Sequence, residues 1–450
     1  MLHSAEARVK SRWVASTTIA RAFMSRPARV ATLVLAAALM SASYVFNAFG
    51  LQPYRYSRAN AEYGHNGYAN YWGARGYVPP VRTETFQIDS EMLVLRKIEA
   101  SDGGRIWKDA GLLVEDEGDG PKPYVSLFGL QGQLLSLAHA HSSRPVRAWI
   151  DGDVRPVFAM LTVGIVLLLL TVFSRNLTPP LLALLAFLLA FSDWIVFVAR
   201  SILYLPFLML LPLVLGWMLP RARRASSGVV ILILIFVTCL LRALCGYDAM
   251  SNVVLGATVG VVYDGLLRGA APGKIAWKVL RVAACGAAGL ATAIVLHVGQ
   301  LTIVSGSVPG ALHLLAGRAA ARTAVPSFTL FLKTTLAYAS VSMVQVPLGT
   351  YVLHIPLGFW LLVQLALLVA AARDRRAVAS TPANAAAISA FWALLCSLSW
   401  AVLFPEHMTA HIHLDPLYFY LPWMPVLFYA VVLRIQEFEL RRADAGLVSP

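Results

Sequence analysis

Long apolar runs, separated by short polar stretches, cover most of the chain. A helix needs about 20 mostly apolar residues to cross a bilayer whose hydrocarbon core is about 30 Å thick. The runs predict about ten spanning helices, near residues 30–49, 157–173, 179–192, 202–219, 228–244, 253–267, 279–299, 355–372, 386–404 and 417–434. The third run is short, and residues 179–219 predict a helical hairpin with Asp193 and Arg200 in its turn. The expected fold class is an all-α polytopic integral membrane protein.

Composition supports this class and excludes two others. Of the 450 residues, 58% are hydrophobic and 13% are charged, and the mean hydropathy is +0.67. Soluble domains contain about 45–50% apolar and about 25% charged residues, so a soluble globular enzyme is excluded. Disorder is excluded because the chain has too much apolar surface to stay solvated. The four cysteines lie in or beside apolar segments without metal-ligand spacing, which favours a packing role.

Basic residues gather in alternate connections between the predicted helices. The segment before residue 30 and every second loop together carry 20 of the 37 Lys and Arg residues. Lys and Arg are enriched in cytoplasmic loops, so both termini are predicted to be cytoplasmic. We expect the inner membrane of a bacterium. The net charge of +14 is then a consequence of topology, and a nucleic-acid partner loses its support.

The pattern divides the chain into seven parts. These are a basic N-terminus (1–29), the first helix (30–49), an extracytoplasmic loop expected to fold compactly (50–156), helices two to seven (157–299), an external segment of re-entrant or interfacial helices (300–354), helices eight to ten (355–434) and a cytoplasmic tail (435–450). Residues 327–346 are apolar enough to span, which would reverse the last two helices. Pro309, Pro326 and Pro347 favour the external interpretation.

Acidic residues concentrate on the predicted outer side. The first external loop and the later outer turns hold 17 of the 23 Asp and Glu residues. Ionisable groups at a membrane face tend to line polar cavities, so we expect any chemistry on this side. The candidate catalytic carboxylates are Glu62, Asp89 and Glu91. The alternative is that Asp89 caps a helix while Glu91 complements its dipole. A Tyr- and Gly-rich stretch, 54–77, suits either sugar stacking or an aromatic belt.

Three later outer turns carry polar residues that packing alone does not require. The candidate substrate-binding residues are Asp193, Arg200, Tyr204, Arg242, Tyr247, Asp248, His407, His411 and His413. An arginine in these turns forms either a local ion pair with a neighbouring carboxylate or a contact to a phosphate, whose oxygens match the guanidinium. The histidine-rich turn fits phosphate or sugar hydrogen bonding, a structural loop, or a divalent metal site. We otherwise expect no cofactor.

The topology resembles the GT-C superfamily of integral-membrane glycosyltransferases. The resemblance consists of many helices, an extended first external loop and acidic residues in that loop, here Glu62 and the pair Asp89/Glu91. The chain departs from the family because Asp89 lies forty residues beyond the first helix. The turns LCGYD (244–248) and HMTAHIH (407–413) also resemble motifs of related bacterial polytopic proteins.

This resemblance implies transfer of a sugar from a polyprenyl-phosphate donor to an envelope glycan, lipid or protein acceptor at the outer face. A loop carboxylate would deprotonate the acceptor hydroxyl, while Arg or His would stabilise the departing lipid phosphate. The alternatives are a polysaccharide polymerase or ligase with a lipid-diphosphate donor, and a flippase or other non-enzymatic protein of envelope assembly. The nearly charge-free helices disfavour a flippase, which requires a hydrated path.

Overall fold

The structure is a computed structural model that describes most of the apolar segments. It covers residues 26–46, 48–49, 128–131, 134, 143–145, 155–199, 204–323, 336, 338–348, 351–375, 381–405 and 415–444, and the backbone of four short strands between residues 85 and 123. Within this part, seven helices are long and apolar enough to cross a membrane, and most of the described residues are helical. This is the architecture of a polytopic helical membrane protein.

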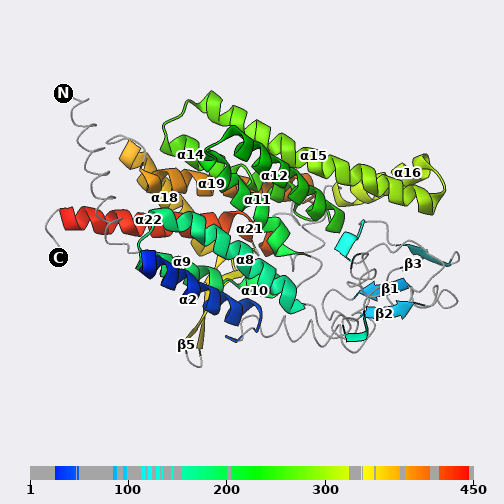
Figure 1. The fold of residues 1–450 in the computed structure, drawn as a ribbon, viewed down its shortest axis with the longest axis horizontal. Helices are drawn as coiled ribbons and strands as arrows, with labels where there is room; N and C mark the ends of the chain where they lie inside the picture. The colour runs from blue at the N-terminus through cyan, green and yellow to red at the C-terminus, as the bar shows by residue number, and fades with distance from the viewer. Residues whose placement is uncertain are drawn as a thin grey trace.

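The helices follow one another along a single elongated bundle (Figure 1). Their bounds are α2 Arg26–Tyr44, α8 Arg155–Phe173, α9 Pro179–Ala190, α10 Asp193–Ala199, α11 Pro206–Met218, α12 Ala225–Cys245, α13 Met250–Gly256, α14 Val259–Leu267, α15 Pro272–Ser305, α16 Val308–Thr323, α18 Leu357–Arg375, α19 Pro382–Leu403, α21 Asp415–Tyr420 and α22 Trp423–Asp444; the 3-10 turns are η1 Ser174–Asn176 and η2 Leu219–Arg221. Each of the ten predicted spans coincides with one of these helices or with a consecutive pair. The number ten itself stays a prediction.

Three of the predicted spans differ from the seven long apolar helices. Helix α9 has 12 residues and α11 has 13, so each is about 18–20 Å long, less than the hydrocarbon thickness. Helix α9 ends where Phe191 accepts a 3.0 Å hydrogen bond from the backbone of Gln345, and α11 begins after Leu205, whose φ is +46°. Helix α22 is long enough, but its second half from Arg434 onward is highly charged.

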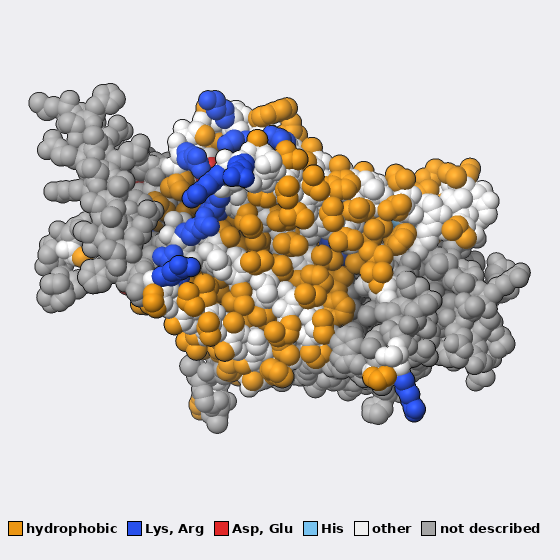
Figure 2. Space-filling view, in the orientation of Figure 1, with side chains coloured by type: hydrophobic (Ala, Val, Ile, Leu, Met, Phe, Trp, Pro, Cys, Tyr) orange, Lys and Arg blue, Asp and Glu red, His pale blue; other side chains and the backbone are white. Residues whose placement is uncertain are grey.

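Basic side chains collect at one end of the bundle (Figure 2). The start of α2, the ends of α8, α11 and α14, and the last part of α22 meet there (Figure 1). We call this the basic end and define it by Arg29, Arg175, Arg221, Arg268 and Arg434. Next to it lies a broad hydrophobic surface (Figure 2). The gathering of alternate loops at one end is the arrangement that the distribution of Lys and Arg predicted.

An ion-pair network joins three helices at the basic end. Arg434 of α22 contacts Asp374 of α18 at 2.7 Å and Glu437 at 2.9 Å, and it donates a hydrogen bond to Asn384 of α19. Arg441 contacts Asp374 at 3.3 Å and Glu437 at 2.7 Å. Because the charges alternate and are partly buried, the network fixes the ends of α18, α19 and α22 relative to one another.

Close helix contacts in the core depend on glycine. A Cβ atom on Gly216 of α11 would overlap the carbonyl group of Ala257, just before α14, and one on Gly260 of α14 would overlap the backbone of Trp217. Small residues of this kind allow membrane helices to approach closely. The space beside this crossing is filled by stacked rings, with Phe173 and Tyr429 centroids 4.1 Å apart and Trp217 and Tyr263 centroids 4.5 Å apart.

The predicted external segment 300–354 is only partly helical. Helix α15 continues to Ser305, Gly306 ends it with φ +73°, and α16 follows. Strands β5 (Ser342–Leu348) and β6 (Tyr351–Pro356) then form an antiparallel hairpin. The expectation of helices throughout was therefore wrong for the described strand residues 342–348 and 351–354, which include Val344, Val346 and Val352, a residue type that favours strands. Because β5 occupies 342–346, residues 327–346 do not form one continuous spanning helix.

Two further hairpins lie in the loop 50–156, which the sequence predicts to be external. Strand β1 (Thr85–Ile88) pairs with β2 (Leu95–Ile98), and β3 (Leu113–Asp116) pairs with β4 (Gly120–Pro123), both antiparallel. A helix was one interpretation of the apolar run that follows Asp89. The last residue of this run, Leu95, is instead the first residue of strand β2. The compactness of the whole loop stays a prediction, since most of it lies outside the described residues.

Candidate functional site

Many predicted site residues fall outside the part of the chain that the structure describes. These are Glu62, Asp89, Glu91, Arg200, His407, His411 and His413. Asp193 is the first residue of α10, where only its backbone is described. Tyr204, Arg242, Tyr247 and Asp248 are described, and they lie on the segments that flank α11 and α12. The metal alternative concerned the histidines of 407–413, and no metal-binding cluster occurs among the described residues.

The turn between α12 and α13 is built around Arg242. Helix α12 starts at the basic end and is 21 residues long, so its last residue lies about 31 Å away, at the opposite end of the bundle. The fully buried guanidinium of Arg242 donates hydrogen bonds of 2.6 Å to the carbonyl of Gly246 and 3.0 Å to the carbonyl of Asp248. Arg242 thus provides hydrogen-bond partners for two carbonyl groups of the turn that follows α12. Its predicted contact to a phosphate stays a prediction.

Tyr247 links this turn to α15. Its hydroxyl lies 3.0 Å from Nδ1 of His297, and the two rings are 5.6 Å apart and nearly parallel. Burial raises the pKa of Tyr247 above its ordinary value, so the phenol is neutral. The other ring nitrogen of His297, Nε2, is buried without a hydrogen-bond partner among the described residues. Tyr247 and His297 therefore form a polar pair within an otherwise apolar region.

The first external loop reaches the same place. Gln131 donates a 3.0 Å hydrogen bond to the carbonyl of Cys245, and Gln300 donates a 3.1 Å bond to the carbonyl of Phe128. The Phe128 ring packs edge-on against His297, with a centroid distance of 6.4 Å. The loop that carries the predicted carboxylates therefore returns to the bundle at the turn that carries Arg242, Tyr247 and Asp248.

A second polar group lies beneath this turn, at the beginning of α13. Asn252 donates to the carbonyls of Tyr418 and Leu421, at 3.0 and 3.3 Å. Ser399 of α19 bonds to Ser251 at 2.9 Å. These bonds tie α13, α19 and α21 together. Tyr204 is buried at the start of α11.

A cavity of about 520 Å³ lies beside these polar groups. It is lined almost entirely by apolar side chains from α13, α15, α16 and α19, together with Tyr247 and Ser251. Met250 and Trp400 are buried in its wall, whereas Ile294 and Leu403 at its margin are 37% and 52% exposed. Because the side chains at its margin are exposed, the cavity opens at the surface of the bundle. An apolar pocket with a few polar groups at one end suits a long hydrocarbon chain with a polar head.

Comparison of the chain with known protein families, curated proteins and solved structures gives no match. The resemblance to the GT-C superfamily thus consists of the features visible in the sequence. Function must be argued from the cavity and its polar margin.

Sequence reasoning missed His297, Ser251 and the cavity. His297 is a single polar residue in the apolar run of α15, and it lies 50 positions from Tyr247. The cavity is formed by residues from 247 to 404, so its existence depends on how four helices pack. The signal that was available is the lone histidine, because an ionisable residue within a spanning segment marks a functional or structurally paired site.

Proposed function

We propose that the protein is a membrane glycosyltransferase that takes a polyprenyl-phosphate-linked sugar from the outer leaflet and transfers the sugar to an envelope glycan, lipid or protein. The observation that carries the proposal is the apolar cavity that has Tyr247 and Ser251 in its lining and exposed apolar side chains at its margin. A polyprenyl chain is long, flexible and apolar, so its transfer from lipid into this cavity requires no unfavourable desolvation. Its phosphate would lie at the end of the bundle opposite the basic end.

The chemistry of transfer requires a base and a group that holds the leaving phosphate. We assign the base to Asp89, Glu91 or Glu62 of the first external loop, which returns to the bundle beside Tyr247 through Phe128 and Gln131. Deprotonation of the acceptor hydroxyl allows attack at the anomeric carbon while the bond to the lipid phosphate breaks. Arg200, His407, His411 and His413 are the candidates for the phosphate, because Arg242 already donates to two carbonyls.

Filling the cavity tests donor binding. Leu290 of α15 lines the cavity, whereas Leu296 lies on the same helix, outside the cavity, and is 45% exposed. In the purified protein, Leu290→Trp should weaken binding of a photo-crosslinkable polyprenyl-phosphate sugar at least tenfold. Leu296→Trp adds the same ring outside the cavity and should leave binding unchanged. Equal binding by both variants would remove the cavity from the proposal.

A transfer assay then separates an enzyme from a binding or transport protein. Asp89→Asn and Glu91→Gln variants that retain donor binding should lose roughly 10²–10⁴-fold in transfer rate if either carboxylate is the base. Full activity in both would leave Glu62. If polyprenyl diphosphate competes with the donor more strongly than polyprenyl monophosphate does, a polymerase or ligase is indicated. Donor binding and movement of the lipid across vesicles, without transfer, indicates a flippase.

A further inference from the structure

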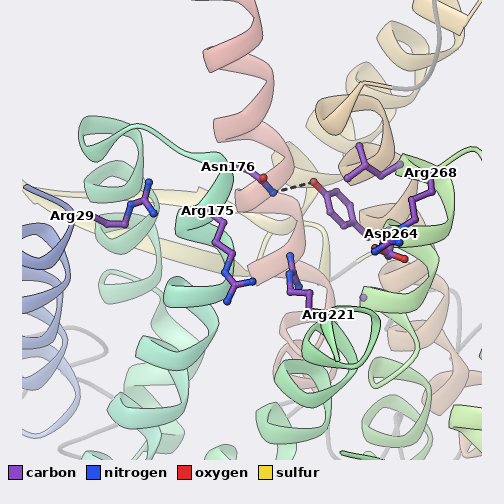
Figure 3. A pocket seen from close by; sticks show the side chains of 9 residues that line it. Arg29, Arg175, Asn176, Arg221, Asp264 and Arg268 are labelled. Atoms are coloured by element: carbon purple, nitrogen blue, oxygen red, sulfur yellow. Dashed lines mark hydrogen bonds and ion pairs between the residues drawn. The ribbon is translucent and has the colours of Figure 1, made fainter. Parts of the chain in front are cut away.

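A second cavity, of about 420 Å³, lies at the basic end, far from the site proposed above. It is formed where α2, η1, η2 and α14 meet, and the residues that define its chemistry are Arg29, Arg175, Asn176, Arg221, Asp264 and Arg268. Figure 3 shows Arg175 and Arg221 extending into the same space from η1 and η2. The cavity therefore combines four guanidinium groups with one carboxylate.

Among the described residues that line the cavity, the one carboxylate is that of Asp264. Asp264 is paired with Arg268 of the same helix at 2.9 Å. Arg221 donates to the backbone carbonyl of Trp217, and its guanidinium lies 5.8 Å from the centre of the Trp217 ring. The Arg175 side chain forms no hydrogen bond or ion pair with the described residues. Two cations that face one cavity repel each other, so an anion between them would be stabilised.

The backbone that carries Arg175 is held firmly although its side chain has no described partner. Asn176 donates to the hydroxyls of Tyr429 and Tyr263, at 2.7 and 3.3 Å. The side chain of Gln436 donates a 2.8 Å hydrogen bond to the carbonyl of Asn176 and accepts a 2.9 Å hydrogen bond from the backbone amide of Thr178. The backbone next to Arg175 is therefore fixed before any ligand binds, and only the arginine side chain has to be ordered on binding.

We propose that this cavity binds the phosphate group of an anionic phospholipid from the leaflet at the basic end. Guanidinium forks match the geometry of phosphate oxygens and form charge-assisted hydrogen bonds with them. Basic pockets between membrane helices are suited to lipid headgroups. The cavity lies where α8, α11 and α14 end, next to the broad apolar surface of Figure 2, so a headgroup can enter while its acyl chains stay in lipid.

The test compares two arginines of equal charge at the same end. Arg175 lines the cavity, whereas Arg223 is exposed and lies outside it. The probe is phosphatidylglycerol, titrated into the full-length protein in phosphatidylcholine nanodiscs and followed by native mass spectrometry. Arg175→Gln should weaken phosphatidylglycerol binding about tenfold, the effect of losing a hydrogen bond to a charged group. Arg223→Gln should change binding at most about twofold. Because Arg175 bonds to no described residue, both variants should fold normally, and their thermal unfolding checks this.

Three outcomes would overturn the proposal. Equal weakening by Arg175→Gln and Arg223→Gln would mean that only the overall surface charge attracts lipid. Unchanged binding in Arg175→Gln would remove the cavity as the site. Binding of inorganic phosphate that displaces phosphatidylglycerol at equal concentration would make the ligand a soluble phosphate compound, and the lipid assignment would fail. None of these results depends on glycosyl transfer, so this proposal and the proposed function can fail separately.

Discussion

The hydroxyl of Tyr247 lies 3.0 Å from Nδ1 of His297, and this contact joins the turn after α12 to the buried face of α15. The predicted external loop packs next to this contact, because Phe128 lies edge-on against His297 and Gln131 donates to the carbonyl of Cys245, two positions before Tyr247. Tyr247 also lines the 520 Å³ cavity. One hydrogen bond therefore connects the return of the external loop, the end of a spanning helix and the polar end of the apolar cavity.

Removing this hydrogen bond should destabilise the protein. Tyr247→Phe leaves buried His297 without a hydrogen-bond partner among the described residues, at an expected cost of about 1–3 kcal/mol. The measurement is thermal unfolding in detergent, with a double-mutant cycle that adds His297→Phe. The matched control is Tyr351→Phe in β6, where the side chain is 78% exposed, and no change is expected there. A coupling energy below about 0.3 kcal/mol would show that the two residues act independently.

The close crossing of α11 and α14 should not tolerate a methyl group. In Gly216→Ala and Gly260→Ala, the new Cβ atom would meet backbone atoms of Ala257 and Trp217, which cannot move as a flexible side chain can. Each substitution should cost about 1–3 kcal/mol or more. Gly164→Ala in α8 is the control, because no atom lies within 4 Å of its Cβ position. That variant should be neutral or up to about 1 kcal/mol more stable, since alanine is the better helix former. Equal unfolding temperatures for all three variants would contradict the crossing.

Substitution of Arg242 distinguishes a structural role of this arginine from a role in phosphate binding. Its two bonds to backbone carbonyls predict that Arg242→Lys loses about 1.5–3 kcal/mol of stability, because a single ammonium cannot reach both acceptors in the same geometry. Arg224→Lys, at the other end of the same helix, should be neutral because that side chain is exposed. The phosphate hypothesis predicts instead a variant of normal stability whose transfer rate is reduced. Parallel measurement of the unfolding temperature and the transfer rate of Arg242→Lys decides between them.

Hydrophobic periodicity and run length predicted where the helices lie, because burial in lipid requires long apolar runs whatever the tertiary structure. They could not predict that α9 stops at Ala190, since the strand residue Gln345 bonds to Phe191 from 154 positions away. The β5–β6 hairpin was missed because its apolar residues were interpreted by hydropathy and not by alternation. The lone histidine in the apolar run of α15 marked His297, but its partner Tyr247 and the cavity around Arg175 depend on residues that folding brings together.

The orientation of the chain gives the last prediction. The basic end unites Ala225 at the start of α12 with Arg375 at the end of α18, whereas Gly120 lies in the first external loop. Single-cysteine variants Ala225→Cys, Arg375→Cys and Gly120→Cys would be treated with a membrane-impermeant maleimide in right-side-out vesicles. Cys239, Cys245 and Cys396 are buried and Cys285 is half-buried, so Cys285→Ala is included in each background. Only residue 120 should react from outside, and residues 225 and 375 should react after the vesicles are opened, as the excess of Lys and Arg at the basic end requires of a cytoplasmic face. Labelling of residue 375 from outside, with residue 225 protected, would mean an additional crossing between α12 and α18 and would place the ends of α18 and α22 in the opposite orientation.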